Sequence, residues 1–196
     1  MNKKYLETIK SVDGIIYHLQ YHQQRLDGVL NSLNLPHSHN LQTMLNPPLK
    51  GTYRCRVLYD GLSMKIEYFE YIKREIRTLK LLYDDSVFYE DKYEDRDAIN
   101  ALFLQKGTCD DILIVKDGFI TDTSIANLAF YDGLEWVTPK KPLLRGTTRQ
   151  RLIESGKLVQ KEILVSDLKQ FRKVALMNAM IDFDIIPLEN IGEIIC

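Results

Sequence analysis

The sequence predicts an α+β fold of two domains, a small strand-rich domain followed by a larger one that is also rich in strands. Short apolar and β-branched segments alternate with Asp-Gly pairs, which are typical of hairpin turns, at 13–14, 60–61, 117–118 and 132–133. Between the two sets of strands, residues 84–97 carry many charges and no clear period, as a solvated linker does. We expect the small domain over residues 1–84, the linker over 85–91 and the larger domain over 92–196.

The composition excludes several classes of function. The chain has 196 residues with 26 basic and 27 acidic side chains and a net charge of -1, so nothing favours nucleic acid or an anionic membrane as a partner. No apolar run approaches the roughly 18 residues that span a bilayer. Cys55, Cys109 and Cys196 are odd in number and lack CxxC spacing, which argues against structural zinc or a disulfide framework. We therefore expect a cytoplasmic protein.

The first domain begins with a predicted hairpin, in which residues 5–10 and 15–19 flank the turn at Asp13-Gly14. From Gln20 the apolar residues recur at helical spacing as far as Leu33, and Leu35-Pro36 predicts the end of this helix. The later elements are a short helix that Pro47-Pro48 ends and three strands, at 41–45, 52–59, 63–69 and 75–82.

The larger domain is predicted to begin with a helix over 95–105, which stops at Lys106-Gly107. A second helix should start at Gly146-Thr147-Thr148 and end at Gly156, and Ser166-Asp167 should cap a brief one. The strands of this domain are expected at 112–115, 119–121, 128–131, 135–138, 158–164 and 173–178.

A polar patch follows the second of these strands. Asp122 stands where the strand ends, and Thr123, Ser124 and Asn127 come directly after it. Polar residues gathered at the end of a buried strand are typical of functional sites. A turn held by hydrogen bonds from side chains to the backbone explains these residues equally well.

Six segments occur along the chain in one order: Leu6-Glu7-Thr8-Ile9-Lys10, His22-Gln23-Gln24-Arg25-Leu26, Lys92-Tyr93-Glu94-Asp95-Arg96, Thr121-Asp122 with Ala126-Asn127, Thr138-Pro139 and Gly146-Thr147-Thr148-Arg149. In this order they resemble the class IV aminotransferase family. These fold type IV pyridoxal-phosphate enzymes comprise branched-chain and D-amino-acid aminotransferases and aminodeoxychorismate lyases. The resemblance covers nearly the whole chain and implies a two-domain enzyme whose larger domain is barrel-like and holds pyridoxal 5'-phosphate.

The resemblance also implies roles for particular residues. Lys92 matches the lysine that forms a Schiff base with the cofactor, although a lysine in so charged a run is ordinarily a solvated one. Asp122 matches the carboxylate that faces the pyridine nitrogen, where the family usually has glutamate, and it follows Lys92 by 122 − 92 = 30 residues. Arg25 matches the arginine that binds the cofactor phosphate. The other expected cofactor contacts are Asn127, Thr147, Thr148, Asn178 and Ala179.

Candidates for substrate binding are less determined. Thr8 and Lys10 share one face of the first strand, and Arg54 and Arg56 share one face of another, because positions two apart point to the same side. Each of these is more ordinarily a surface residue or a cross-strand partner. Arg96 and Met180 are the remaining candidates.

The Lys-x-x-x-Arg spacing of Lys92 and Arg96 resembles the aminodeoxychorismate lyases rather than the aminotransferases, which often carry Asn-Tyr there. The expected reaction is conversion of 4-amino-4-deoxychorismate to 4-aminobenzoate and pyruvate, in folate synthesis. The alternatives are an aminotransferase for D- or branched-chain amino acids, and a binding subunit that has lost catalysis. The second alternative arises because the family usually has a further strand and loop before the segment that contains Glu7. The family also implies a homodimer with twofold symmetry.

Overall fold

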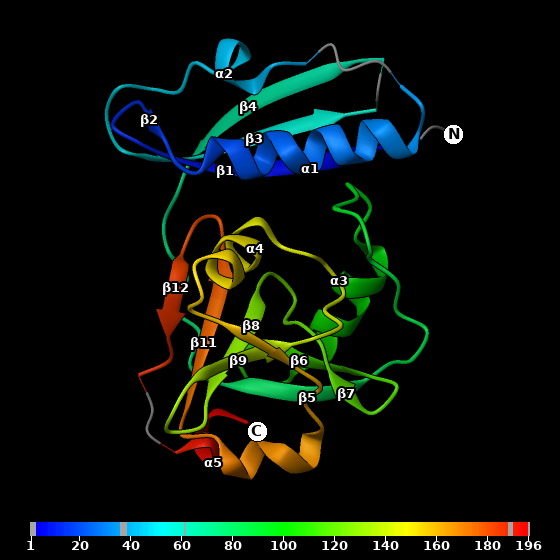
Figure 1. Cartoon of the computed structure of the whole chain (residues 1–196), viewed down its shortest axis with the longest axis vertical. Coiled ribbons are helices and arrows are strands. Elements are labelled where there is room, and N and C mark those ends of the chain that lie inside the picture. Colours follow the sequence, from blue (N-terminus) through cyan, green and yellow to red (C-terminus); the bar gives the residue numbers. More distant parts are fainter. Residues whose placement is uncertain (1–2, 36–38, 61, 188–189, 196) are drawn as a thin grey trace. The chain divides into compact units, whose positions relative to one another are not determined.

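Figure 1 shows a computed structural model of the chain, which describes residues 3–35, 39–60, 62–187 and 190–195. Predictions that involve Pro36, Gly61 and Cys196 lie outside these residues. Within the described ranges, no helix has both the length and the apolar character that crossing a membrane requires.

The chain divides into two compact units and passes from one to the other three times. Met1–Lys73 and Asp91–Asp95 form the first unit, and Arg74–Glu90 and Arg96–Cys196 form the second. This division differs from the predicted boundaries at residues 84 and 91. The segment from Arg74 onward joins the second unit because its strand β5 (Leu79–Tyr83) pairs there in parallel with β6 (Asp111–Lys116).

Asp91–Asp95 returns to the first unit through backbone hydrogen bonds. The amide of Leu6 donates to the carbonyl of Lys92 at 2.8 Å, and the amide of Glu94 donates to the carbonyl of Lys4 at 2.9 Å. The ring of Tyr93 lies 5.5 Å from the ring of Tyr5. The segment that was predicted to begin the second domain is therefore part of the first unit.

The first unit is an antiparallel sheet with one long helix along it (Figure 1). Its strand order is β2-β1-β3-β4. The strands are β1 (Tyr5–Val12), β2 (Ile15–Ile16), β3 (Thr52–Tyr59) and β4 (Met64–Glu70), and the helices are α1 (Leu19–Ser32) and α2 (Leu41–Met44). Asp13 and Gly14 have φ of 48° and 80°, which confirms the predicted hairpin turn.

Alternate residues of β1 point into the core of the first unit. Tyr5 and Ile9 are buried there with Leu26 and Leu30 of α1 and with Val57 of β3. Period-two burial on the strand and the buried helical stripe are the patterns from which these elements were predicted. The other face of β1 and β3 carries the polar side chains of Thr8, Lys10, Arg54 and Arg56.

The second unit contains two sheets. One has the order β10-β9-β8-β11-β12 and the other has the order β5-β6-β7. Isolated bridges between Asp122 and Asn127 and between Phe119 and Leu164 link the two, in keeping with the predicted barrel-like arrangement. The strands not yet given are β7 (Phe119–Ile120), β8 (Asn127–Tyr131), β9 (Trp136–Pro139), β10 (Val159–Lys161), β11 (Lys173–Asn178) and β12 (Asp182–Ile185).

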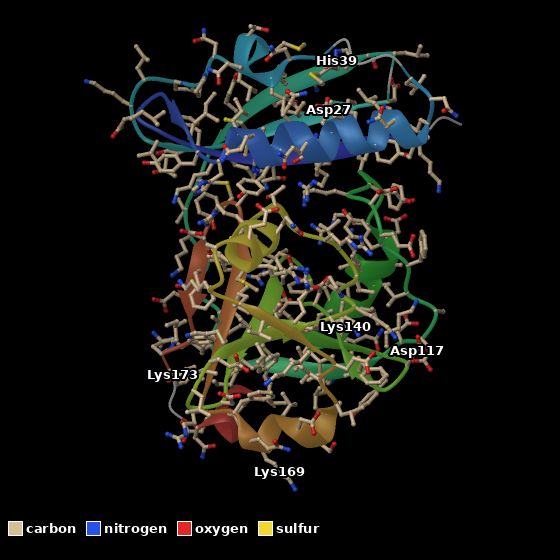
Figure 2. All side chains as sticks on the ribbon, viewed as in Figure 1. Asp27, His39, Asp117, Lys140, Lys169 and Lys173 are labelled. Carbon is tan, nitrogen blue, oxygen red and sulfur yellow. The ribbon has the colours of Figure 1, made fainter. Side chains whose placement is uncertain are left out.

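Helices of the second unit pack against inner strands of these sheets. Helix α3 (Asp97–Phe103) lies against β6, and α4 (Thr147–Glu154) lies against β11. Asp117, labelled in Figure 2, and Gly118 form the tight turn from β6 to β7, with φ of 51° and 80°. The remaining helical turns are η1 (Leu104–Lys106), η2 (Val165–Gln170) and α5 (Ile191–Ile194).

Several predicted elements differ in extent. The strand expected over 75–82 is shorter and lies in the second unit, and the one expected over 158–164 is only β10. The hairpin strand expected to reach Leu19 stops at Ile16, because α1 begins at Leu19. Two elements, β12 and α5, were not predicted, since their short sequences carry no clear period.

The cysteines do not all fit the expectation that the chain has no disulfide framework. Cys55 is a buried free thiol whose Sγ donates to the Ser11 hydroxyl at 3.5 Å. Cys109, in contrast, is disulfide-bonded, so the expectation drawn from sequence spacing was wrong for this residue. Spacing along the chain does not reveal which sulfurs the fold brings together.

Candidate active site

The predicted site residues fall into two sets, one in each unit. The set in the first unit comprises Thr8, Lys10, Arg25, Arg54, Arg56 and Lys92. The set in the second unit comprises Arg96, Asp122, Asn127, Thr147, Thr148, Asn178, Ala179 and Met180. Each set is described within its own unit.

The first set is built around Glu7, a fully buried carboxylate on β1. Arg25 of α1 donates from Nε to Oε1 at 2.7 Å and from Nη2 to Oε2 at 2.6 Å. His22, one helical turn earlier, donates from Nδ1 to the same Oε2 at 2.6 Å. Glu7 therefore fixes the orientation of the predicted phosphate arginine, and two of its guanidinium donors are used in doing so.

The charges of this cluster set its protonation. Burial by itself raises the pKa of Glu7, but the charge of Arg25 and the hydrogen bonds from His22 and Arg25 outweigh it, so that the pKa falls to about 2. Burial lowers the pKa of His22, Glu7 opposes this, and Arg25 and Lys92 add to it. At neutral pH the cluster thus holds an ionised Glu7 and a neutral His22 that donates its Nδ1 hydrogen.

Glu7 and His22 were not predicted as site residues, and His22 was interpreted as packing. The missed signal lies in the pattern of β1: Glu7 occupies the phase of Tyr5 and Ile9, which are buried. A carboxylate at such a position needs a charged partner, and Arg25 on the neighbouring helix supplies one.

Lys92 lies next to this cluster. Its carbonyl accepts a hydrogen bond from Leu6, the residue before Glu7, and its charge acts on the imidazole of His22. The structure therefore brings Lys92, Glu7, His22 and Arg25 together in one unit, although they come from three separate stretches of sequence.

The four predicted substrate candidates of the first unit are also brought together. In the register of β1 and β3, Thr8 lies opposite Arg56 and Lys10 lies opposite Arg54, so all four share the face away from Glu7. Arg56 donates to Glu67 and Glu94, at 3.1 Å in each case. Arg56 is thus already paired, whereas Lys10 and Arg54 lie over the rings of Tyr17 and Phe69.

The second set is centred on Asp122, which is buried at the end of β7. Its Oδ1 accepts from Nδ2 of Asn127 at 2.7 Å, and its Oδ2 accepts from the amide of Leu144 at 2.9 Å. Nδ2 of Asn127 also donates to the carbonyl of Leu144 at 2.8 Å. The turn alternative is thus realised in part, because Asp122 ties the strand end to the loop before α4.

Burial raises the pKa of Asp122. The hydrogen bonds from Leu144 and Asn127 and the charge of Arg149 lower it only in part, so the pKa is about 6, above its ordinary value. The carboxyl group is therefore largely ionised at neutral pH. Each carboxylate oxygen has further acceptor capacity beyond its present bond. Asp122 can accordingly accept a hydrogen bond from one more donor without losing its two partners.

The N-terminus of α4 lies beside this carboxylate. Thr147 and Thr148 are buried in its first turn, and among the described residues nothing accepts a hydrogen bond from their amides. A Cβ on Gly146 would lie 2.1 Å from Oδ1 of Asn127, so only glycine lets the helix begin this close to β8. The helix start and the strand end are thereby locked together.

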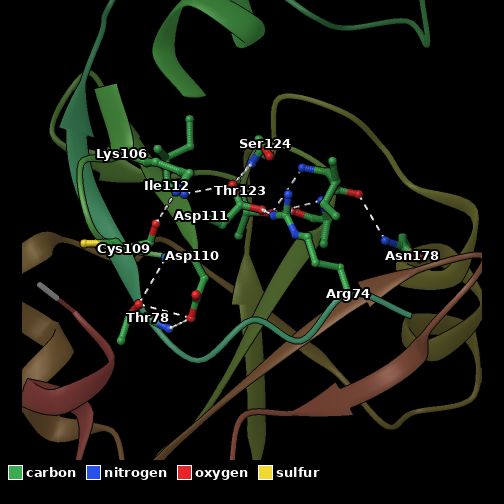
Figure 3. A network of polar contacts seen from close by, with 12 residues as sticks. Arg74, Thr78, Lys106, Cys109, Asp110, Asp111, Ile112, Thr123, Ser124 and Asn178 are labelled. Carbon is green, nitrogen blue, oxygen red and sulfur yellow. Dashed lines mark hydrogen bonds and ion pairs between the residues drawn. The ribbon is translucent and has the colours of Figure 1, made fainter. Parts of the chain in front are cut away.

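Figure 3 shows the polar network that supports the loop after Asp122. The buried carboxylate of Asp111 accepts from Arg74 at 2.6 Å, from the amide of Ile112 at 2.8 Å and from the amide of Ser124 at 3.3 Å. Nη2 of Arg96 donates to the carbonyl of Ser124. The loop is therefore held from both sides. Neither Arg74 nor Asp111 was predicted, because they lie 37 residues apart in sequence.

The predicted residues of the last loop support the same segment. Asn178 donates from Nδ2 to the carbonyl of Ile125 at 3.2 Å, and its Oδ1 accepts from the amides of Met180 and Ile181. Ala179 lies between these contacts in sequence. Asn178 thus connects the end of β11 to the loop that follows Asp122.

Arg149 is a buried cation to which the sequence assigned no role of its own. Its Nη2 donates to the carbonyl of Pro139 at 2.8 Å and to Gln160 at 2.9 Å, which ties α4 to β9 and β10. Burial lowers the pKa of the guanidinium, and the negative charge of Asp122 opposes that shift. Arg149 thereby places positive charge behind the helix N-terminus.

Within each unit, the residues suit a part of pyridoxal phosphate. In the second unit, the amides of Thr147 and Thr148 have no acceptor among the described residues and lie at the positive end of a helix, which suits a phosphate group. The ionised Asp122 of the same unit suits a protonated pyridine nitrogen. In the first unit, Lys92 has an amine that suits an aldehyde, and Arg25, oriented by Glu7, is a cation that suits a phosphate.

Comparisons with known proteins identify the family of this chain. The amino-transferase class IV family model matches residues 91–190. A Haemophilus influenzae protein with the name "Uncharacterized protein" is 36% identical over 180 residues, which cover 89% of this chain and 96% of that protein. The crystal structure of a "putative 4-amino-4-deoxychorismate lyase" from Haemophilus somnus 129PT has 35% identity and a TM-score of 0.84 and covers 92% of this chain and 97% of that one. A Schizosaccharomyces pombe protein, "Putative aminodeoxychorismate lyase", is 28% identical over 189 residues, covering 85% of this chain and 82% of that protein.

The two-unit fold, with a buried carboxylate beside a helix N-terminus, defines a fold type IV enzyme that depends on pyridoxal phosphate. The match to the family model and the relative of 36% identity show the family: the chain belongs to the amino-transferase class IV family.

Proposed function

We propose that the protein is a lyase that converts 4-amino-4-deoxychorismate to 4-aminobenzoate and pyruvate. The observation that carries this proposal is Arg96, four residues after Lys92, where aminotransferases of the family often have Asn-Tyr. Arg96 binds the carbonyl of Ser124 and so holds the loop after Asp122. The likeness to the Haemophilus somnus structure over nearly the whole chain supports the same reaction.

In this reaction the bound cofactor stabilises the negative charge that forms at the carbon bearing the substrate's amino group. Lys92 accepts the proton from that ring carbon through Nζ. The bond between the ring and the enolpyruvyl oxygen then breaks, and Lys92 returns a proton to the methylene carbon of the departing three-carbon unit, which leaves as pyruvate. The ring that remains is aromatic, which makes the elimination favourable.

Other residues orient and bind. Asp122 holds a negative charge at neutral pH, the amides of Thr147 and Thr148 receive an anion, and Glu7 keeps Arg25 in one orientation. Asn127 and the loop at Leu144 keep Asp122 in place. These contacts are pre-organised, so binding needs little rearrangement of the residues within each unit.

The experiment is to supply purified, cofactor-loaded protein with 4-amino-4-deoxychorismate and to measure aminobenzoate by fluorescence and pyruvate by a coupled dehydrogenase. We expect equal amounts of both products from the native protein and from Lys65→Ala, which removes an exposed lysine of the same unit. Lys92→Ala should give neither product. Native protein that binds the cofactor but yields no aminobenzoate would overturn the lyase.

The same preparation separates the two alternatives. If a D- or branched-chain amino acid converts the bound cofactor to its amine form, the protein is an aminotransferase. If the native protein gives no visible absorption band with pyridoxal phosphate and borohydride fixes no cofactor to Lys92, it is a binding subunit. We also propose a cytoplasmic homodimer with twofold symmetry whose product feeds folate synthesis; light scattering of the purified protein measures its mass in solution.

A further inference from the structure

His22 lies inside the cluster around Glu7, and the reaction proposed above assigns it no role. Its side chain is 2% exposed and that of Glu7 is 0% exposed, whereas that of Arg25 is 16% exposed. A ligand in solution therefore reaches this cluster through Arg25 rather than through His22. Any effect of His22 on such a ligand has to act through Glu7 and Arg25.

The charges of the cluster do not suit an anion as they stand. The guanidinium of Arg25 donates to both carboxylate oxygens of Glu7, and the two charges cancel. With a neutral His22 the three side chains carry no net charge, although Arg25 is the residue expected to bind the cofactor phosphate. That phosphate carries about two negative charges at neutral pH. An anion held at so little-exposed a cluster gains from one further positive charge there.

His22 is placed to supply this charge. Its Nδ1 lies 2.6 Å from Oε2 of Glu7, so a carboxylate already faces the ring. Among the described residues nothing donates a hydrogen bond to Nε2, so the lone pair of this nitrogen can accept a proton. The imidazolium that results keeps its hydrogen bond to Glu7, because both ring nitrogens then carry hydrogen.

The groups around the cluster determine when His22 is protonated. They are Glu7 and Tyr5 of β1, Tyr59 of β3, Arg25 of the same helix, and Asp91 and Lys92 of the returning segment. Burial raises the pKa of both tyrosines and the charge of Asp91 adds to this, so neither tyrosine is charged at neutral pH. Burial also lowers the pKa of His22, Glu7 opposes this, and Arg25 and Lys92 add to it.

An anion beside Arg25 changes this balance. Its negative charge offsets the positive charge of the guanidinium, which is one of the influences that keep His22 neutral. The carboxylate of Glu7 then acts on the imidazole with less opposition. A proton on His22 becomes more favourable when the anion is bound than when it is absent.

We propose that His22 takes up one proton when the cofactor phosphate binds to Arg25, so that His22, Glu7 and Arg25 together hold the anion with a net positive charge. The proton comes from water and adds to Nε2, and no covalent bond between heavy atoms changes. His22 is thus a positioning residue that acts through Glu7. The inference goes beyond the proposed reaction, because it depends on cofactor binding and not on what the loaded protein then does.

Calorimetry of cofactor binding measures this proton. Cofactor-free protein is titrated with pyridoxal phosphate at neutral pH in buffers that differ in ionisation enthalpy, and the change of binding enthalpy between buffers gives the number of protons taken up. The matched variant is His22→Gln, whose amide can still donate to Glu7 but cannot be protonated. We expect native protein to take up about one proton more than His22→Gln. The subtraction cancels the protons that the cofactor and Lys92 exchange.

Two comparisons assign the proton to the phosphate and to His22. Pyridoxal lacks the phosphate, so native protein and His22→Gln should take up equal numbers of protons when they bind it. The variant His39→Gln makes the same exchange at another histidine of this unit, labelled in Figure 2. It should take up as many protons with pyridoxal phosphate as the native protein does.

The affinity for pyridoxal phosphate should depend on pH in the same way. Because the proton is taken up on binding, affinity is lost as pH rises from the pKa of His22 in the free protein to its higher pKa in the loaded protein. Within this interval each pH unit should weaken binding by native protein up to about tenfold more than binding by His22→Gln.

Nitrogen NMR of the labelled imidazole observes His22 directly. The ring should be neutral, with hydrogen on Nδ1, in the free protein and charged in the loaded protein at the same pH. This measurement needs only native protein, so it decides the question even if His22→Gln does not fold.

The inference is overturned if native protein and His22→Gln take up equal numbers of protons with pyridoxal phosphate, if pyridoxal gives the same difference, or if His22 stays neutral in the loaded protein. These results leave the lyase proposal intact, because aminobenzoate formation is measured separately. A difference of one proton in a protein that forms no aminobenzoate would remove the lyase alone. Native protein that binds no pyridoxal phosphate would remove both.

Discussion

Arg25 and Glu7 form a two-point ion pair in which Nε and Nη2 of the guanidinium donate to the two carboxylate oxygens at 2.7 and 2.6 Å. The carboxylate is fully buried, so the pair is screened little by solvent. Lysine cannot reproduce this planar geometry. The pair joins strand β1 to helix α1. It also orients Arg25, the residue predicted to bind the cofactor phosphate.

Glu7→Gln keeps the shape of the side chain but removes its charge, and it should destabilise the protein by about 3 kcal/mol, because Arg25 is left without its partner. The matched change Glu67→Gln affects a partly exposed pair and should cost less than about 1 kcal/mol. Urea denaturation of the three proteins measures both values. Equal midpoints for Glu7→Gln and Glu67→Gln would contradict the role given to Glu7.

Stability should depend on pH through Glu7. Its pKa is about 2 in the folded protein, below the ordinary 4.5. Folding therefore favours the ionised form of Glu7. Ionised Glu7 adds about 3 kcal/mol to the free energy of unfolding. This stabilisation is complete above pH 4.5 and is lost as pH falls toward 2. Denaturation curves at several pH values should show this loss in the native protein, and Glu7→Gln should lack it.

Asp122 should act in the opposite direction. Its pKa of about 6 lies above the ordinary 3.8, so folding favours the protonated form and stability falls as pH rises between these values. At neutral pH the ionised Asp122 lowers the free energy of unfolding of the cofactor-free protein by about 3 kcal/mol. Comparison of native protein with Asp122→Asn from pH 3 to 7 isolates the effect as a difference in slope. A parallel pair of pH profiles would show that this carboxyl has no raised pKa.

Gly146→Ala should disrupt the second set of site residues. The added methyl group would meet Oδ1 of Asn127, which must move and loosen its bond to Asp122. We expect a loss of about 2 kcal/mol in stability, typical of overpacking, and a weaker cofactor affinity. Gly28→Ala is the matched control: it lies within α1 with nothing near its Cβ, and it should stabilise by about 0.5 kcal/mol. Thermal unfolding and cofactor titration distinguish the two.

Asp111→Ala should remove the support of the loop after Asp122. The amides of Ile112 and Ser124 and the guanidinium of Arg74 lose their acceptor, which should cost about 2 kcal/mol. Glu75→Ala breaks an exposed pair with Arg77 and should cost less than about 1 kcal/mol. Denaturation midpoints of the two variants measure both losses of stability. Hydrogen exchange at the amide of Ser124 should accelerate only in Asp111→Ala. Unchanged exchange there would contradict the supporting role of Asp111.

Most of the fold could be predicted because its elements have clear periods and turns. Helix α1, strands β3 and β11 and the Asp-Gly turns at 13–14, 117–118 and 132–133 are local patterns, and they appear where they were expected. The partner of β5 could not be predicted, since parallel pairing with β6 joins residues far apart in sequence. Local patterns likewise do not show that Asp91–Asp95 returns to the first sheet.

The candidate site was predicted in part. The resemblance pointed to Arg25, Lys92 and Asp122, and the structure shows what surrounds each of them. It did not point to the partners that hold them, because a motif records which residues recur and not which atoms they touch. The buried position of Glu7 on its strand was the one physical signal that could have been used.

The repeated passage of the chain between its two units has a consequence for synthesis and for evolution. The first unit is incomplete until Asp91–Asp95 has left the ribosome, so the growing chain carries the start of the second unit before the first has all its hydrogen bonds. No single cut separates the units, and neither can be transferred alone to another gene. Lys92 belongs to the returning segment, so the proposed reactive amine is inherited only together with both halves of the protein.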